Sequence, residues 1–202
     1  MLMKKILFAT GNPTKAKRFS VGLLKNDIEV LSLKDLNIEI DVEENGSSAI
    51  ENALIKARAC YEKTKMPVIG MDDTLYLDGV PEDKQPGMFV RRVNGKVLND
   101  EEMIEHYTNL VKEYGVDGKL FCKWIYGMAV IDEKGKESTY TWCKDNFYMV
   151  DTKSEKINPG YPLNSISKYK GLDKYFTEVT DEDLETVKVS EEHVVDFIAK
   201  NI

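Results

Sequence analysis

The apolar and polar positions at the start of the chain follow first a strand pattern and then a helix pattern. Residues 5–9 form an apolar run that is typical of a buried strand. A polar turn over 10–13 leads into a helix that is expected to bury Phe19, Leu23 and Leu24. The predicted order is therefore strand, loop, helix.

Extended chain and a second helix are predicted next. Residues 29–33 are predicted to form a strand, and residues 38–42 alternate apolar and acidic positions, as an exposed strand or extended arm does. Ser48, followed three residues later by Glu51, matches a capping box, which predicts a helix over 49–63.

A short strand and a longer helix are predicted in the middle of the chain. Residues 68–71 are apolar enough for a short strand, and residues 80–87 are typical of a loop. Residues 99–114 predict a helix with one apolar face. That face carries Met103, Ile104, Tyr107, Leu110 and Val111.

The second half of the chain changes to strand patterns. Residues 120–131 and 137–150 are rich in aromatic and β-branched residues, and the turn residues 132–136 between them predict a long antiparallel hairpin. Residues 158–171 are expected to form a loop. Ser190 is expected to cap a final helix.

Composition narrows the class of protein. The 202 residues, 42% of them hydrophobic, suffice for one globular domain, which is expected to span residues 1–202. The apolar runs are too short to cross a bilayer, so no membrane association is expected. A net charge of −7 argues against non-specific nucleic-acid binding. Three cysteines without metal-site spacing indicate reduced packing residues in a cytoplasmic protein.

The first loop has the residues of a phosphate-binding turn. Thr10, Gly11 and Asn12 lie between the first strand and its helix, and Lys15 falls in the first helical turn. Backbone amides at the helix start and the lysine would converge on one anion. The spacing fits neither a Walker loop nor a dinucleotide-binding glycine turn. An ordinary polar turn with a solvent-facing lysine is the alternative.

Carboxylates form a candidate metal site. Asp72 and Asp73 are adjacent and are expected where the 68–71 strand ends, so they repel each other unless a cation is present. Together with Glu44 they are a sufficient ligand set for magnesium, with manganese as the second choice. A solvated acidic turn is the alternative interpretation.

Further cations are weaker candidates. Arg91 could bring a guanidinium group to phosphates, and Lys56 could face the same site, although both types are common on surfaces. His106 and His193 are expected to be exposed surface residues rather than general bases.

Four segments, in this order and at these separations, resemble the inosine triphosphate pyrophosphatase family. The family is also called the Ham1 or noncanonical purine nucleoside triphosphate pyrophosphatase family. The segments are residues 9–15, 43–57 and 72–74, and Pro86-Gly87. Specific motifs cover about the first 95 residues.

The resemblance implies a fold and a reaction. The expected fold is α/β, with a long twisted mixed sheet, flanking helices and two lobes around a central cleft, as a homodimer. The expected reaction is hydrolysis of a noncanonical purine nucleoside triphosphate to the monophosphate and pyrophosphate by metal-activated water.

The same resemblance implies a role for each residue. Substrate binding would use Thr10, Gly11, Asn12, Lys15, Lys56, Arg91 and Tyr161. Metal binding would use Glu44, Asp72 and Asp73, and catalysis Asp73, Glu44 and Lys15, with Asp73 binding metal or orienting the attacking water.

The chain departs from the family pattern in its C-terminal half. Besides a tolerable change near the start of the chain, where Arg18 replaces the usual glutamate, Tyr161 lies in a motif without its aspartate, and residues 190–193 lack the serine-histidine-arginine motif. Because the family reads the purine base with those segments, base and sugar preference stay open. A non-catalytic nucleotide-binding or sensing protein is therefore the second hypothesis, and a dinucleotide-dependent oxidoreductase ranks last because the glycine fingerprint is missing.

Overall fold

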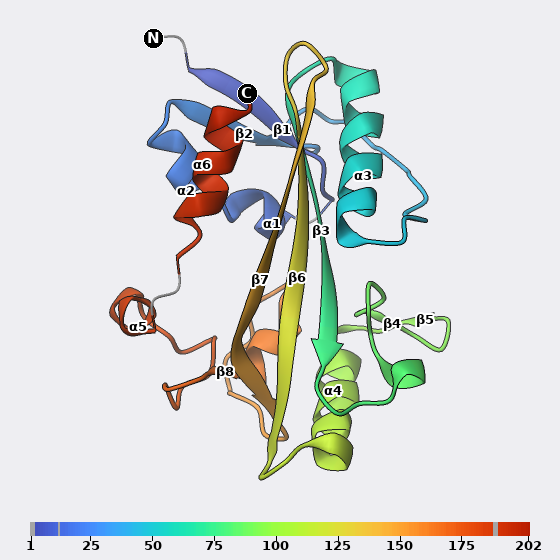
Figure 1. Ribbon diagram of the computed structural model, residues 1–202, viewed down its shortest axis with the longest axis vertical. Helices are drawn as coiled ribbons and strands as arrows, with labels where there is room; N and C mark the ends of the chain where they lie inside the picture. Colours follow the sequence, from blue (N-terminus) through green and yellow to red (C-terminus); the bar gives the residue numbers. More distant parts are fainter. Residues whose placement is uncertain (1–2, 12, 188–189) are drawn as a thin grey trace. The chain divides into compact units, whose positions relative to one another are not determined.

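The protein has a mixed six-stranded sheet (Figure 1). The structure is a computed structural model that describes residues 3–11, 13–187 and 190–202. Its strands are β1 (Lys4–Phe8), β2 (Ile28–Ser32), β3 (Val68–Leu77), β4 (Arg92–Val93), β5 (Lys96–Val97), β6 (Lys119–Ile131), β7 (Glu137–Val150) and β8 (Ser167–Tyr169). The main sheet has the order β2-β1-β3-β6-β7-β8, and β4 pairs with β5 separately.

Helices of very different lengths accompany the sheet. They are α1 (Pro13–Lys17), α2 (Ser20–Leu24), α3 (Ala49–Thr64), α4 (Asp100–Tyr114), α5 (Asp181–Thr186) and α6 (Glu192–Lys200), with short 3-10 turns η1 (Glu82–Lys84) and η2 (Pro162–Ser165). Strand β1 pairs in parallel with β2 and β3, whereas β7 pairs antiparallel with β8. The expected α/β class with a mixed sheet and flanking helices is confirmed.

The chain divides into two compact units. The first consists of Met1–Asp73, Tyr126–Trp142 and Glu191–Ile202, and the second of Thr74–Ile125 and Cys143–Ser190. Strands β3, β6 and β7 contribute residues to both units. The assignment of the whole chain to one domain stays a prediction.

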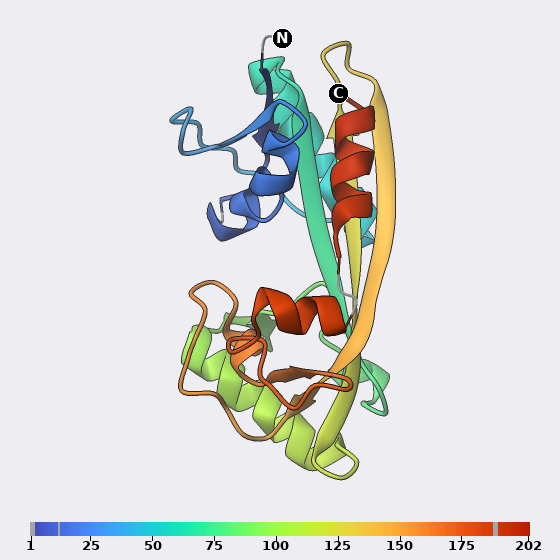
Figure 2. The ribbon, with the colours of Figure 1, turned by 90° about the vertical axis from the view of Figure 1, so that its left-hand side faces the viewer.

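The first unit buries both faces of its strands. Leu7 of β1 packs with Ala53 of α3, whereas the next residue along the strand, Phe8, stacks on Phe19 with ring centroids 6.4 Å apart. Successive strand residues point to opposite faces, so α3 covers one face and the α1–α2 segment the other. Helix α6 lies alongside β7 (Figure 2), where Phe197 stacks on Tyr140 with centroids 5.0 Å apart.

Close contact between α3 and β3 depends on a glycine. A Cβ atom at Gly70 would lie 2.0 Å from the carbonyl oxygen of Ala53 and 2.9 Å from the Cβ of Ala57. Only glycine permits so close an approach. The helix is therefore pressed against the strand that carries Asp72 and Asp73.

The second unit has its own core around α4. Asn99 and Glu102 form a capping box at the start of this helix, and all five residues of its predicted apolar face are buried. They pack against the buried side chains of β3, β6 and β7, including Leu75, Leu120 and Phe147. The predicted helix over 99–114 and the two strands joined by 132–136 are confirmed.

Several expectations about local structure are wrong. The 68–71 strand does not end before Asp72 but continues to Leu77, because Leu75 and Leu77 are buried and Leu75 exchanges backbone hydrogen bonds with Gly87. The loop expected over 158–171 contains η2 and β8, which pairs with β7.

Predictions for the two ends of the chain are also wrong in part. The first helix is divided into α1 and α2, and Leu24 is 55% exposed because Leu23 occupies the core position. At the other end, the N-cap residue of α6 is Glu191 and not Ser190.

Candidate active site

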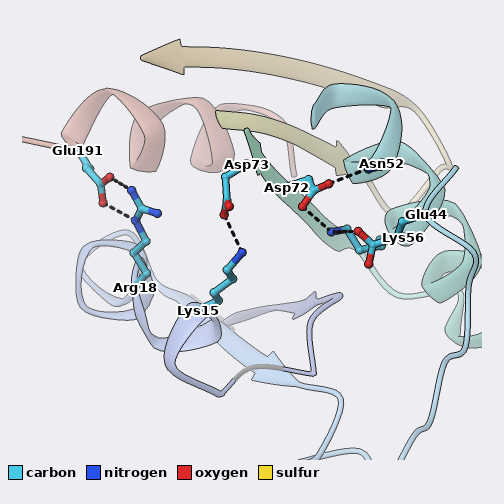
Figure 3. Close-up of polar contacts among 8 residues, drawn as sticks. All are labelled: Lys15, Arg18, Glu44, Asn52, Lys56, Asp72, Asp73 and Glu191. Carbon is cyan, nitrogen blue, oxygen red and sulfur yellow. Dashed lines mark hydrogen bonds and ion pairs between the residues drawn. The ribbon is translucent and has the colours of Figure 1, made fainter. Parts of the chain in front are cut away.

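Asp72 and Asp73 point away from each other. Both belong to β3, and consecutive strand residues project to opposite faces. Asp72 accordingly contacts Asn52 and Lys56 of α3, and Asp73 contacts Lys15 of α1 (Figure 3). One acidic dipeptide thus supplies a carboxylate to each side of the sheet.

Lys56 joins two of the predicted metal ligands. Its Nζ atom lies 2.9 Å from Oε2 of Glu44 and 3.2 Å from Oδ1 of Asp72. The Lys56 and Asp72 side chains are each 14% exposed, whereas Glu44 is 44% exposed. Two carboxylates from distant parts of the chain therefore converge on one positive charge.

Asn52 ties the Glu44 segment to β3. Its Oδ1 accepts a hydrogen bond of 2.8 Å from the N–H of Gly46, and its Nδ2 donates one of 2.9 Å to Oδ2 of Asp72. The residue is only 2% exposed. Asn52 was not predicted as a site residue. It lies four residues before Lys56, however, and this spacing places both residues on one face of a helix.

The start of α3 explains why these side chains are in place. One half of the predicted capping box forms, because Ser48 accepts a hydrogen bond from the N–H of Glu51. The other half is replaced, because the carboxylate of Glu51 accepts from the backbone N–H and the hydroxyl of Ser47 and not from the N–H of Ser48. This cap fixes the first turn of α3, which carries Asn52, and Lys56 projects from the next turn on the same face.

Lys15 forms the second cation–carboxylate contact. Its Nζ lies 2.6 Å from Oδ2 of Asp73, and both side chains are largely buried, at 23% and 18% exposed. Lys15 follows the β1–α1 loop, as the sequence predicted. The structure thus brings the loop lysine to one of the predicted catalytic carboxylates.

The loop before Lys15 is described in part. Thr10 is half-buried, and its N–H donates to the carbonyl of Phe8. Gly11 is exposed, and a Cβ added there would meet no atom within 4 Å. Asn12 lies outside the described residues.

Arg91 and Tyr161 belong to the second unit. Nη1 of Arg91 donates to Oδ1 of Asp100 at 2.8 Å and to the carbonyl of Leu98 at 3.1 Å, just before α4. Tyr161 precedes η2, and its N–H donates to the carbonyl of Asn158. Their roles in substrate binding stay predictions.

The donor set of the first unit suits a hard divalent cation. Glu44 and Asp72 offer carboxylate oxygens that already lie around one positive charge, and magnesium needs only one or two protein carboxylates. Among the described residues, no three His, Cys, Asp or Glu side chains come together as a metal-binding group. Glu44 and Asp72 are thus the pair that the geometry brings together.

The remaining reactive side chains have packing roles or surface positions. His106 is half-buried rather than exposed, and burial lowers the pKa of its imidazole. His193 is exposed, as expected. Cys60 and Cys122 are buried, and burial raises the pKa of the Cys60 thiol to about 11. Cys143 is exposed, so the packing role expected for it is wrong.

Sequence comparison identifies the family. The sequence model of the Ham1 family matches residues 6–144, which is more than half of the chain. The chain belongs to the Ham1 family. The match includes the Lys15, Glu44, Lys56 and Asp72–Asp73 segments and ends before the C-terminal residues in which the sequence departs from the family pattern.

Curated relatives agree with this membership of the Ham1 family. A protein of Oceanobacillus iheyensis called dITP/XTP pyrophosphatase is 35% identical over 139 residues, 68% of each chain. A dITP/XTP pyrophosphatase of Leptospira interrogans is 28% identical and matches 90% of this chain and 88% of its own.

The fold is similar to those of solved Ham1 structures. The Staphylococcus aureus Ham1 protein has a TM-score of 0.73 at 22% identity, covering 98% of this chain and all of its own. A Coxiella burnetii HAM1 protein has a TM-score of 0.70 at 20% identity, covering 98% of each chain. Within the part of the chain that the structure describes, no helix is long and apolar enough to cross a membrane.

Proposed function

We propose that this protein hydrolyses a nucleoside triphosphate to the monophosphate and pyrophosphate, with a noncanonical purine as the base. The observation that carries the proposal is the pair of contacts on β3, Lys15 with Asp73 and Lys56 with Glu44 and Asp72. The names of the relatives in the Ham1 family support the same reaction.

Two lysines provide the charge that a triphosphate needs. Phosphoryl chemistry depends mainly on positioning and on neutralising negative charge. Lys15 reaches the acidic strand from the β1–α1 loop, and Lys56 reaches it from α3. Each would exchange a carboxylate for phosphate oxygens when substrate binds. Thr10, Gly11, Asn12, Arg91 and Tyr161 are proposed as further substrate contacts.

Glu44 and Asp72 would hold magnesium, or manganese in its place. Bound there, the metal would offset negative charge on the phosphate oxygens during the displacement. Asn52 orients Asp72 for that role through its amide hydrogen bond. Asp73 as a third metal ligand stays a prediction, because its carboxylate faces Lys15 on the other side of the strand.

Asp73 is the proposed proton acceptor. A carboxylate beside the attacking water can take its proton as the new oxygen–phosphorus bond forms. When Lys15 turns to the phosphates, the Asp73 carboxylate gives up its contact at 2.6 Å and would be left to face the attacking water. Lys15 and Asp73 would therefore act as a unit.

A non-catalytic nucleotide-binding or sensing protein is the second candidate. It is favoured by the end of the Ham1 match at residue 144, which leaves the predicted base-reading segments outside it. We also propose that the protein is a homodimer and acts in the cytoplasm. Sedimentation equilibrium at micromolar concentration tests the dimer, and a monomer would contradict it.

The test is pyrophosphate release from inosine, xanthosine and the standard nucleoside triphosphates in the presence of magnesium. We expect release from at least one oxopurine nucleotide and a loss of about 10³-fold or more in kcat for Asp73→Asn. Arg58→Gln, which alters an exposed ion pair on α3, is the control and should keep wild-type rates. Binding without release across the panel would support the sensing protein instead.

A further inference from the structure

An arginine, Arg18, lies three residues after Lys15 and makes a forked ion pair. The Nε atom of Arg18 donates to Oε2 of Glu191 at 2.9 Å, and Nη2 donates to Oε1 of the same carboxylate. The two residues are 173 positions apart, and both side chains are largely buried. A bidentate arginine–carboxylate pair restricts orientation as well as distance.

Aromatic rings enclose the Arg18 guanidinium. Its Cζ atom lies 4.6 Å from the ring centroid of Tyr126, 5.3 Å from that of Phe19 and 6.0 Å from that of Trp142. Tyr126 and Trp142 are themselves stacked, with centroids 4.9 Å apart. Burial is the largest single influence and disfavours the charge on Arg18, but the hydrogen bond to Glu191 and the electrostatic interactions with Tyr126 and Glu191 together outweigh it and raise the pKa above its usual value. The guanidinium is thus held from several directions.

Helix α1 is too short to hold its place by its own hydrogen bonds. It is five residues long, far below the length at which an isolated helix is stable in water. Its described buried contacts are Ala16 and, just beyond its end, Phe19. Arg18 lies in the turn that ends α1, where its N–H donates to the carbonyl of Lys15 at 3.2 Å.

Lys15 and Arg18, which lie in the same turn, reach different partners. Lys15 contacts Asp73 of β3, and Arg18 contacts Glu191, the residue directly before α6 (Figure 3). The backbone that carries Lys15 is therefore fixed, one turn later, to the beginning of the last helix. Loss of the fork would remove this second anchor of the turn and loosen the placement of Lys15 against Asp73.

We propose that Arg18 and Glu191 are positioning residues that fix Lys15 for binding the triphosphate group. This inference rests on the proposed function, because it takes Lys15 as a phosphate ligand. It makes the C-terminal helix part of the phosphate site, although Glu191 itself touches no phosphate. A lysine that binds phosphate equally in the ground state and transition state contributes mainly to KM.

The variants Arg18→Lys and Glu191→Gln test the proposal, because each removes the fork while keeping the size of the side chain close to the original. We expect each to raise KM about tenfold with little change in kcat, and to weaken binding of inorganic tripolyphosphate, measured by calorimetry, by a similar factor. The exchanged pair Arg18→Glu with Glu191→Arg should recover a large part of both losses.

A second forked pair in the same unit gives a matched control. Arg58 of α3 donates from Nε and Nη2 to the two carboxylate oxygens of Glu137, at 2.7 Å each, and these side chains are more exposed. Arg58→Lys and Glu137→Gln should leave KM and tripolyphosphate affinity unchanged. Urea unfolding of every variant shows whether a kinetic change reflects loss of the folded structure. If a single variant does not fold, the proposal is tested with the exchanged pair.

Wild-type KM and tripolyphosphate affinity in Arg18→Lys and Glu191→Gln would overturn the proposal. A fall in kcat with KM unchanged would also overturn it, as would a wild-type protein that binds no tripolyphosphate. Failure of the proposed function is distinguishable, because it appears as absence of turnover in the wild type, whereas the calorimetric comparison of variants needs no turnover.

Discussion

Replacement of Asn52 by alanine tests the geometry of the acidic site. The change removes the hydrogen bond from Gly46 and the hydrogen bond to Asp72, in a place where a side chain only 2% exposed leaves little access for water. A hydrogen bond to a charged group contributes about 1.5–3 kcal/mol and a neutral one about 1 kcal/mol. We therefore expect the free energy of unfolding to fall by about 3 kcal/mol.

The same change should lower activity more than stability alone explains. Asp72 loses the amide that orients it, and small misplacements of a site group cost up to about 10²-fold in rate. Urea unfolding and kcat/KM for inosine triphosphate measure the two effects. Asn26→Ala is the matched control, because Asn26 makes an exposed hydrogen bond to the carbonyl of Gly22 and should change neither quantity appreciably.

Asn52→Asp separates charge from packing. The new carboxylate would replace the donor 2.9 Å from Asp72, so it should destabilise the protein at pH 7, and magnesium should restore more stability than it gives to the wild type. The reasoning is refuted if Asn52→Ala loses less than about 1 kcal/mol of stability and keeps wild-type kcat/KM.

Three further changes test the packing and protonation of other parts of the molecule. Gly70→Ala should lower the free energy of unfolding in urea by about 2–3 kcal/mol or prevent folding, because its Cβ would lie 2.0 Å from the carbonyl oxygen of Ala53; an unchanged midpoint would contradict the close packing of α3. Burial lowers the pKa of His106 below that of the unfolded chain, so stability should fall as the pH drops below about 6.5. This loss of stability at low pH should be smaller in His106→Gln but not in His193→Gln. Equal pH profiles for His106→Gln and the wild type would refute the role of His106. One of the three thiols should react with a disulfide reagent in a fast phase when the protein is folded, and Cys143→Ser should abolish this fast phase. A fast phase that remains in Cys143→Ser would show that a buried thiol is accessible.

Local patterns in the sequence were sufficient to predict the long elements of the fold. The apolar face within residues 99–114 predicted the position of α4 within one residue, and the turn residues 132–136 predicted the connection between β6 and β7. Such features depend on neighbours within a few positions, so a single sequence contains them.

Contacts between distant segments were harder to predict. The sequence marked Asp72 and Asp73 as functional but placed both at the end of the 68–71 strand, where they could share one metal. In β3 they face opposite sides, because the buried Leu75 and Leu77 extend the strand beyond them. The Arg18–Glu191 pair joins residues 173 positions apart, a distance at which periodicity carries no information.

Departures from the family pattern gave a further clue that could be interpreted only in three dimensions. Arg18 stands where the family pattern has a glutamate, and Glu191 lies in the 190–193 segment that lacks the serine-histidine-arginine motif; neither position by itself indicated a contact with the other. In the structure they are partners, so the two departures compensate each other in charge. A pair of changes of opposite sign is therefore a reason to look for contact.

The central claim is that the Lys15–Asp73 and Lys56–Glu44–Asp72 contacts belong to an enzyme that releases pyrophosphate. Phosphorus NMR of inosine triphosphate incubated with the protein and magnesium tests it most directly, because it distinguishes the products. The account predicts inosine monophosphate and pyrophosphate in equal amounts, and neither with Asp73→Asn. Inosine diphosphate with orthophosphate, or an unchanged triphosphate spectrum that persists with xanthosine triphosphate as substrate, would contradict it.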